Sequence, residues 1–300
     1  MKILVIGGTY FLGRVFTMFA SQKHELTLIN RGQYSMKNLG VKELHFDRHD
    51  ITHLKNITED YDAVVDFCAY QEGDIQTIVE SISGKIKHYI FISTCDVYQR
   101  DANIMKDENY SFNTIDYGGE TGNYINQKVL LEKELVKVCQ KYDIAYSSIR
   151  PANIYGPFNY APRESLFIQM IVNQSPFIRL KDNDGKFQLV YVKDVANAII
   201  KVIEEKAYNE SFNIVSNEII DYNDLYRILE KVSHSSVQYI EMSSQEAMQY
   251  QYPLPYPINK EETQLYDGQK IVNTFHFQYT PLKEGMEKTY QAFLPVFKEK

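Results

Sequence analysis

Tyr124 and Lys128 stand four positions apart in a predicted helix, and Thr94 follows a short apolar run upstream. Residues four apart share a helix face, so the Lys128 ammonium is expected beside the Tyr124 phenol. A free phenol titrates at about pH 10, and a nearby positive charge favours the phenolate and lowers this pKa. Such a tyrosine can take the proton from a secondary alcohol as hydride leaves, while the Thr94 hydroxyl, or that of Ser93, holds the alcohol oxygen. We therefore predict that Thr94, Tyr124 and Lys128 are catalytic.

The pair alone is weak evidence, because the chain has 24 tyrosines. A glycine-rich turn strengthens it, since Gly7-Gly-Thr-Tyr-Phe-Leu-Gly13 follows the first apolar run directly. In a dinucleotide-binding turn the first glycine permits a tight bend, the last lets helix and strand approach, and helix amides face the pyrophosphate. Tyr10 departs from this pattern where a second glycine is usual, so its side chain must swing away or partly cover the phosphates. The predicted contacts of the cofactor here are Gly7, Thr9, Tyr10, Phe11, Leu12 and Gly13.

The second predicted strand ends in Asn30-Arg31-Gly32, without the acidic residue that accepts the ribose hydroxyls of NAD. Arg31 could instead hold a 2′-phosphate through charge-assisted hydrogen bonds. This favours NADP over NAD but leaves both cofactors open. It also leaves open the alternative that Arg31 points into solvent. Asp47 and Arg48, after the third strand, are expected to flank the adenine.

The elements that would position these residues alternate between strand and helix. Strands are predicted at 2–6, 25–29, 43–46, 63–67, 89–92 and 145–149, and helices at 11–21, 75–82 and 124–142. This alternation predicts an α/β fold with a Rossmann-type, doubly wound parallel sheet, whose ligand lies beyond the carboxyl ends of the strands. All the motifs above fall at those ends.

The second half of the chain has a different composition. Segments 159–165 and 182–186 resemble loops, and 251–260 is rich in proline and tyrosine. We predict a dinucleotide-binding domain over residues 1–155 and, mainly over 156–300, a smaller lobe that binds substrate. Strands at 189–192 and 212–215 are expected to return to the sheet.

Composition excludes several classes of protein. A net charge of −7 without a long basic run argues against nucleic acid as a partner. No apolar run has the length of a membrane span and no signal peptide is evident, and the three cysteines lack metal-ligand spacing. We expect a cytoplasmic protein with reduced thiols, no metal and no membrane contact, and a homodimer is one assembly that the sequence allows.

Taken together, the motifs resemble the NAD-dependent epimerase/dehydratase family of extended short-chain dehydrogenases. The resemblance covers about residues 1–215 and rests on the glycine turn, Ser93-Thr-Cys-Asp-Val-Tyr98, Tyr124-x-x-x-Lys128 with Glu132, Arg150-Pro-Ala-Asn-Ile-Tyr-Gly-Pro157 and Tyr191-Val-Lys-Asp-Val-Ala196. Asn30-Arg31-Gly32 and Asp62-Ala-Val-Val-Asp66 are similar to a branch that includes relatives of chloroplast stem-loop-binding proteins. The resemblance implies that Thr94, Tyr124 and Lys128 are catalytic and that Asn153 approaches the substrate. The other predicted cofactor contacts are Cys68, Ala69, Tyr70, Ser93, Tyr124, Lys128 and Pro151.

Two departures bear on the substrate. Nucleotide-sugar enzymes of the family usually carry a diphosphate-binding arginine seven residues before the aspartate that matches Asp194, where this chain has Phe187. Arg179 is the predicted substitute, with Lys186 and Arg163 as further candidates. Ile125 replaces the small residue common after the catalytic tyrosine. Asp194 itself is predicted to cap a helix.

Two classes of function follow. The first is an epimerase or reductase that acts on a small molecule, with a nucleotide sugar as the leading substrate. A 4,6-dehydratase is disfavoured, because Cys95-Asp96 retains half of the expected Asp-Glu pair. The second is a non-catalytic NAD(P)-bound protein that binds RNA or senses redox state, but such relatives tend to lose the tyrosine-lysine pair.

Overall fold

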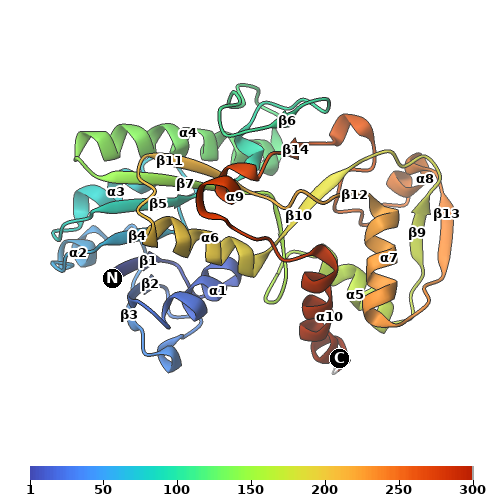
Figure 1. Cartoon of the computed structure of the whole chain (residues 1–300), viewed down its shortest axis with the longest axis horizontal. Coiled ribbons are helices and arrows are strands. Elements are labelled where there is room, and N and C mark those ends of the chain that lie inside the picture. Colours follow the sequence, from blue (N-terminus) through green and yellow to red (C-terminus); the bar gives the residue numbers. More distant parts are fainter. Residues whose placement is uncertain (299–300) are drawn as a thin grey trace.

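A parallel sheet of seven strands forms the centre of the computed structural model, which describes residues 1–298. The strand order is β11-β7-β5-β4-β1-β2-β3, and every neighbouring pair is parallel (Figure 1). The order reverses between β1 and β4, which opens a crevice at the carboxyl ends of these strands. The predicted fold class is confirmed. The strands are β1 Lys2–Ile6, β2 Glu25–Asn30, β3 Lys42–His45, β4 Ala63–Asp66, β5 His88–Ile92, β7 Ala145–Pro151 and β11 Glu210–Ile214.

Helices cover both faces of this sheet (Figure 1). Alternate residues of β1 face opposite sides: Ile3 and Val5 join the core under α1 (Phe11–Ala20) and α6 (Val192–Glu204). Leu4 and Ile6 join the core on the other face, where the helices are α2 (Ile51–Lys55), α3 (Asp74–Ser81) and α4 (Gly119–Lys141). Burial on both faces explains why these strands are short continuous apolar runs.

Outside the central sheet lie several small sheets and the remaining helices, most of which form a second body (Figure 1). β8, β10 and β12 form one sheet, β9 pairs with β13, and β6 pairs with β14. The bounds are β6 Met105–Lys106, β8 Asn153–Tyr155, β9 Phe177–Leu180, β10 Phe187–Tyr191, β12 Ile219–Ile220, β13 Tyr239–Met242, β14 Leu265–Tyr266, α5 Glu164–Val172, α7 Tyr222–Ser233, α8 Ser244–Gln249, α9 Gln269–Phe275 and α10 Leu282–Lys298. Short 3-10 helices occupy Lys37–Leu39, Cys95–Val97 and Lys260–Glu262.

One prediction about this region is wrong. The segment predicted at 189–192 does not return to the central sheet, because β10 pairs with β8 and β12 instead. Only β11 joins the central sheet, beside β7. β10 is buried along its whole length, and a short apolar run of this kind fits any buried sheet, so its pattern alone does not specify its neighbours.

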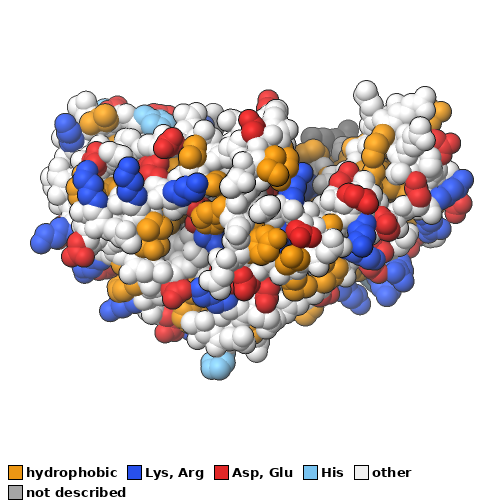
Figure 2. Space-filling view, turned by 90° about the horizontal axis from the view of Figure 1, so that it is seen from above, with side chains coloured by type: hydrophobic (Ala, Val, Ile, Leu, Met, Phe, Trp, Pro, Cys, Tyr) orange, Lys and Arg blue, Asp and Glu red, His pale blue; other side chains and the backbone are white. Residues whose placement is uncertain are grey.

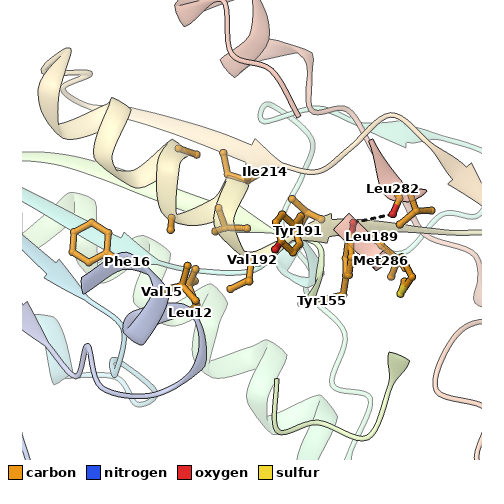
Figure 3. Close-up of a cluster of buried hydrophobic side chains, with 14 of the residues drawn as sticks. Leu12, Val15, Phe16, Tyr155, Leu189, Tyr191, Val192, Ile214, Leu282 and Met286 are labelled. Atoms are coloured by element: carbon orange, nitrogen blue, oxygen red, sulfur yellow. Dashed lines mark hydrogen bonds between the residues drawn. The ribbon is translucent and has the colours of Figure 1, made fainter. Parts of the chain in front are cut away.

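A continuous apolar core joins the two bodies. Figure 3 shows Leu12 and Phe16 of α1 on one side of this cluster and Met286 of α10 on the other. Tyr155 lies between them and donates a hydrogen bond from its hydroxyl to the carbonyl oxygen of Leu282 at 3.4 Å. The position of the second body relative to the sheet crevice is therefore held by packed side chains.

Candidate active site

A cavity of about 1140 Å³ occupies the crevice at the carboxyl ends of the strands and extends to the second body. It brings together most of the predicted site residues. Those that line it are Gly7, Thr9, Tyr10, Phe11, Leu12, Gly13, Asn30, Arg31, Asp47, Arg48, Cys68, Tyr70, Ser93, Thr94, Tyr124, Lys128, Pro151 and Asn153. Ala69 is buried beside the wall, and Arg179 is not part of the lining.

The glycine turn has the geometry of an anion cradle. Gly7 and Gly8 adopt φ values of +93° and +82°, which glycine accepts without a steric penalty. A Cβ on Gly7 would lie 2.6 Å from the Cys68 sulfur, and one on Gly13 would lie 2.9 Å from the Gly8 Cα. The first turn of α1 therefore lies against the cradle with free backbone amides, which suits a pyrophosphate.

The end of β2 also fits the adenosine part of a dinucleotide. The Asn30 side-chain oxygen accepts a hydrogen bond from the Gly32 amide at 2.7 Å. Its Nδ2 is buried without a hydrogen-bond partner among residues 1–298, and Asn30 lines the cavity. A buried donor of this kind calls for a polar partner. Arg31 is exposed at the cavity, with no hydrogen bond or ion pair to the described part of the chain.

Arg48 forms more contacts within the protein than the sequence indicates. Its guanidinium forms two hydrogen bonds with the Asp66 carboxylate, at 2.8 and 2.9 Å, and a third with the carbonyl oxygen of Asp74. The Asp66 carboxylate raises the pKa of Arg48 against the opposing effect of burial. Arg48 thus lines the cavity with its charge paired to Asp66. The Asp47 carboxylate forms a hydrogen bond with the exposed His49 ring at 2.9 Å.

Two elements bring together the predicted catalytic side chains: Thr94 follows β5, and Tyr124 and Lys128 lie in α4. The Lys128 ammonium donates hydrogen bonds to the carbonyl oxygens of Ala69 and Ile92, at 2.9 and 2.8 Å. It lies 5.8 Å from the centroid of the Tyr124 ring. Burial lowers the pKa of Lys128 to about 8, although nearby carboxylates oppose this shift.

In the protein without a cofactor, the surroundings of Tyr124 raise its pKa. Burial raises the pKa of the phenol well above its usual value, and the carboxylate of Asp96 raises it further. The Thr94 hydroxyl opposes these effects through a hydrogen bond, but does not outweigh them. Lys128 is not among the main influences on this pKa, and its ammonium donates hydrogen bonds to two carbonyl oxygens.

Asp96 extends this cluster further into the cavity. Its carboxylate accepts hydrogen bonds from the Thr94 hydroxyl at 3.3 Å and from the Tyr266 hydroxyl at 3.2 Å. Sequence reasoning noted Asp96 only as half of a dehydratase pair and missed Tyr266. The separation of Asp96 and Tyr266 along the sequence does not indicate this contact, because Tyr266 reaches the site only through the β14–β6 pairing.

A buried ion pair attaches the helix of Tyr124 and Lys128 to the sheet. Glu132 of α4 accepts hydrogen bonds from Arg150 of β7 at 2.8 and 2.9 Å, and both side chains are almost fully buried. Ser148 donates a further hydrogen bond to Glu132 at 2.6 Å. Arg150 also donates to the Tyr98 hydroxyl at 2.9 Å. This network attaches α4, which carries Tyr124 and Lys128, to β7.

The predicted substitutes for a diphosphate-binding arginine do not all reach the cavity. The Arg179 guanidinium lies 3.7 Å above the Tyr239 ring in the β9–β13 pair, and Lys186 forms an ion pair with Asp221 at 2.7 Å. Among the predicted candidates, only Arg163 lines the cavity, and Arg100, which sequence reasoning missed, lines it as well. The expected contact between Arg179 and substrate is therefore not supported.

Phe187 lies at the cavity, whereas Asp194 contacts Thr280. Phe187 lines the cavity and stacks on Tyr256 with ring centroids 4.3 Å apart. Asp194 is not a helix cap as predicted, since Tyr191 precedes α6 as its N-cap. The Asp194 carboxylate instead accepts hydrogen bonds from the amide and hydroxyl of Thr280, at 2.7 and 2.8 Å.

Within residues 1–298, no cluster of His, Cys, Asp and Glu side chains has the arrangement of a metal site. The same residues include no helix with the length and apolarity needed to span a bilayer.

Residues 75–215 match the NAD dependent epimerase/dehydratase family. The chain is 28% identical over 248 residues to the chloroplast stem-loop binding protein of 41 kDa b of Arabidopsis thaliana, covering 77% of this chain and 62% of that protein. It is 24% identical over 271 residues to a trifunctional UDP-glucose 4,6-dehydratase/UDP-4-keto-6-deoxy-D-glucose 3,5-epimerase/UDP-4-keto-L-rhamnose-reductase of the same plant, covering 81% of this chain and 38% of that protein. The chain thus spans less than two thirds of the length of either relative.

Solved structures share the fold along nearly the whole chain. A UDP-glucose 4-epimerase of Thermotoga maritima with UDP-glucose superposes with a TM-score of 0.78 at 20% identity, covering 99% of both chains. A UDP-glucuronic acid 4-epimerase of Bacillus cereus, in complex with UDP-glucuronic acid and NAD, gives 0.76 at 19% identity, covering 99% of this chain and 100% of that one.

Proposed function

We propose that this chain is a member of the NAD-dependent epimerase/dehydratase family, whose model matches residues 75–215, and that it is an NAD(P)-dependent enzyme. The proposed reaction moves hydride between a nicotinamide ring and a secondary alcohol or ketone carbon of a nucleotide sugar. One observation carries the proposal. The side chains of Thr94, Tyr124 and Lys128 line the same cavity as the glycine turn, although they come from separate segments of the chain.

In this proposal Tyr124 exchanges the proton and Thr94 orients the substrate oxygen. The Thr94 hydroxyl bonds the Asp96 carboxylate, which fixes its direction in the cavity. Lys128 holds a positive charge near the phenol and is itself held by two carbonyl oxygens. A bound oxidised nicotinamide dinucleotide supplies the hydride acceptor and a second positive charge. Positive charge favours the phenolate, so in this proposal cofactor binding lowers the pKa of Tyr124.

The proposed cofactor is NADP or NAD, with NADP favoured. The exposed Arg31 guanidinium and the absence of an acidic side chain at the end of β2 support a 2′-phosphate. The Asn30 Nδ2 group and the cradle at Gly7 and Gly13 suit either dinucleotide.

The proposed substrate lies between the reaction centre and the lobe that residues 156–300 mainly form. Arg100 and Arg163 are the cations that line this part of the cavity, and guanidinium groups suit the diphosphate of a nucleotide sugar. The names of the structural relatives, which include UDP-glucose and UDP-glucuronic acid epimerases, support the same class of substrate.

The test begins with the purified protein. Mass spectrometry of the released small molecules should identify NADP or NAD, and incubation with UDP-sugars should produce an epimer or a reduced sugar detectable by NMR. If the wild-type protein binds neither dinucleotide at millimolar concentration, the proposal is wrong.

RNA binding is the second candidate, because the chloroplast relative is named as a stem-loop binding protein. The net charge of −7 argues against it. Figure 2 shows acidic and basic side chains interspersed over one face, without a large basic patch on that face. Retardation of a stem-loop RNA at physiological salt, together with no turnover of any sugar nucleotide, would favour this candidate over the enzyme.

A further inference from the structure

Three tyrosine rings form a stack at the mouth of the cavity. They come from three separate segments: Tyr10 precedes α1, Tyr34 follows β2, and Tyr160 lies in the loop between β8 and α5. The Tyr10 ring is 5.6 Å from that of Tyr34, with an interplanar angle of 17°, and 4.9 Å from that of Tyr160, with an angle of 28°. Tyr10 is therefore the middle ring.

The stack spans the cavity from one body to the other. Tyr10 and Tyr34 belong to the dinucleotide side, whereas Tyr160 belongs to the lobe side, and all three line the cavity. Their exposed fractions are 50%, 47% and 65%, so each residue is partly open to solvent although its ring contacts at least one other ring of the stack. Burial in a core does not explain this arrangement.

The loop that carries Tyr160 is firmly held. The fully buried Glu164 carboxylate accepts hydrogen bonds from the Gly156 amide at 3.0 Å and from the Asn159 side chain at 2.9 Å. Arg14 of α1 lies 4.7 Å from the ring centroid of Phe158 in the same loop. The stacked position of Tyr160 is thus supported by contacts at the base of the loop and across to α1.

Tyr10 connects the stack to the glycine turn. Tyr10 stands where a dinucleotide-binding turn usually has its second glycine, directly before the first amides of α1. The next residue, Phe11, adopts a φ of +35°, a strained value for a residue with a side chain, and its ring meets Tyr160 edge-on at 6.1 Å. The turn thus accommodates a tyrosine that projects over the cradle.

We infer that the stack of Tyr10, Tyr34 and Tyr160 is a clasp that closes over the pyrophosphate of a bound dinucleotide and limits its release. This inference rests on the proposed function. The cofactor lies beneath the clasp and leaves only after Tyr10 separates from its two neighbours. A retained cofactor favours epimerisation over reduction, because the hydride and proton taken from an alcohol are returned to the same substrate and no external reductant is consumed.

The test measures how fast a dinucleotide leaves the protein. NADPH and NADH are each loaded, and release is followed by the loss of nicotinamide fluorescence after mixing with excess NADP or NAD. Tyr10→Gly and Tyr160→Ala should each release the nucleotide roughly tenfold faster, the size expected for the loss of an aromatic ring pair. The double variant should be little faster than Tyr10→Gly, because the middle ring is shared.

Two controls separate the clasp from general damage. Tyr160→Phe keeps the ring and should release the nucleotide as slowly as the wild type. Tyr250→Ala removes a tyrosine of similar exposure, 68%, that does not line the cavity, and it should have no effect.

Wild-type release rates in both Tyr10→Gly and Tyr160→Ala would overturn the clasp and leave the proposed function intact. Failure of the wild-type protein to bind either dinucleotide would overturn both. A Tyr34→Ala variant provides the same comparison if Tyr10→Gly does not fold.

Discussion

Tyr124 and Lys128 lie in surroundings that favour the neutral form of both side chains. Burial and Asp96 raise the pKa of the phenol, and burial lowers the pKa of the ammonium to about 8. In the proposed reaction the pair therefore becomes an effective base when the positive charge of a bound cofactor enters the cavity. This couples the proposed proton transfer to cofactor binding and makes the state of Lys128 accessible to measurement in the protein alone.

Lys128→Met tests the shifted ammonium. In the folded protein Lys128 loses its proton at about pH 8, against 10.5 as its ordinary value. Between these values the unfolded chain binds more protons, so the free energy of unfolding rises with pH. Urea unfolding of the wild type and the variant should differ by a constant amount below pH 8. Above pH 8 the difference should shift in favour of the wild type. A difference independent of pH from 7 to 10 would contradict the shift.

Arg31→Asp tests the nucleotide preference. The variant should weaken NADP binding more than NAD binding, by about 1–3 kcal/mol, because a charged hydrogen bond is lost and repulsion is added. Calorimetric titration of both nucleotides measures this difference. Arg227→Asp is the control, since Arg227 lies in α7 and does not line the cavity. Equal losses for NADP and NAD would mean that Arg31 does not contact the 2′-phosphate.

At the scale of elements, the active site depends on how α4 is attached to β7. Glu132 and Arg150 lie in a buried network that also includes Ser148 and Tyr98. Tyr124 and Lys128 lie on the same helix, two turns and one turn before Glu132. The ion pair therefore acts on the site through the position of the helix.

Glu132→Ala should strongly destabilise the fold. It leaves the buried Arg150 guanidinium without its carboxylate, which costs about 3–5 kcal/mol. Urea unfolding measures the loss, and replacing both residues by methionine should restore part of it. Glu284→Ala breaks an exposed pair with Lys288 and should cost only about 0.5 kcal/mol. Similar losses for the buried and the exposed pair would contradict the role of the network.

Local patterns predicted the strands of the central sheet, α1 and α3 to within a few residues, because their apolar runs are buried on the two faces of one sheet. No range was predicted for α2 or α6. The start of α4 was missed, since Gly119–Asn123 contains no apolar residue that marks a buried face. The strands that pair with β10 and the contacts of Arg179 and Asp194 were also not predicted. Each depends on segments distant in sequence: β8 for the strand, Tyr239 for Arg179 and Thr280 for Asp194.

At the scale of the whole molecule, one apolar core holds the two bodies on either side of the cavity (Figure 3). The glycine turn and the proposed catalytic residues belong to the central sheet and the helices that cover it, whereas Arg163 and Tyr160 belong to a loop of the second body. The same cavity therefore combines the proposed dinucleotide site, which local motifs predict, with the proposed substrate site, which depends on the tertiary fold.

The substrate site predicts protection by a nucleoside diphosphate. With NADP present, UDP should raise the melting temperature, and the rise should increase with UDP concentration as linkage requires. Arg163→Ala should reduce this rise, while Arg227→Ala should not. If NADP protects but no nucleoside diphosphate does at millimolar concentration, the substrate is a smaller alcohol or ketone without a diphosphate.

The central claim is that Tyr124 exchanges the proton of a nicotinamide-dependent reaction, and Tyr124→Phe tests it most directly. On a sugar nucleotide that the wild type converts, kcat should fall about 10²–10⁴-fold, because only the ionisable hydroxyl is lost. The dissociation constant of the dinucleotide should stay within about threefold, and Tyr250→Phe should retain full activity. Wild-type turnover by Tyr124→Phe would contradict the account.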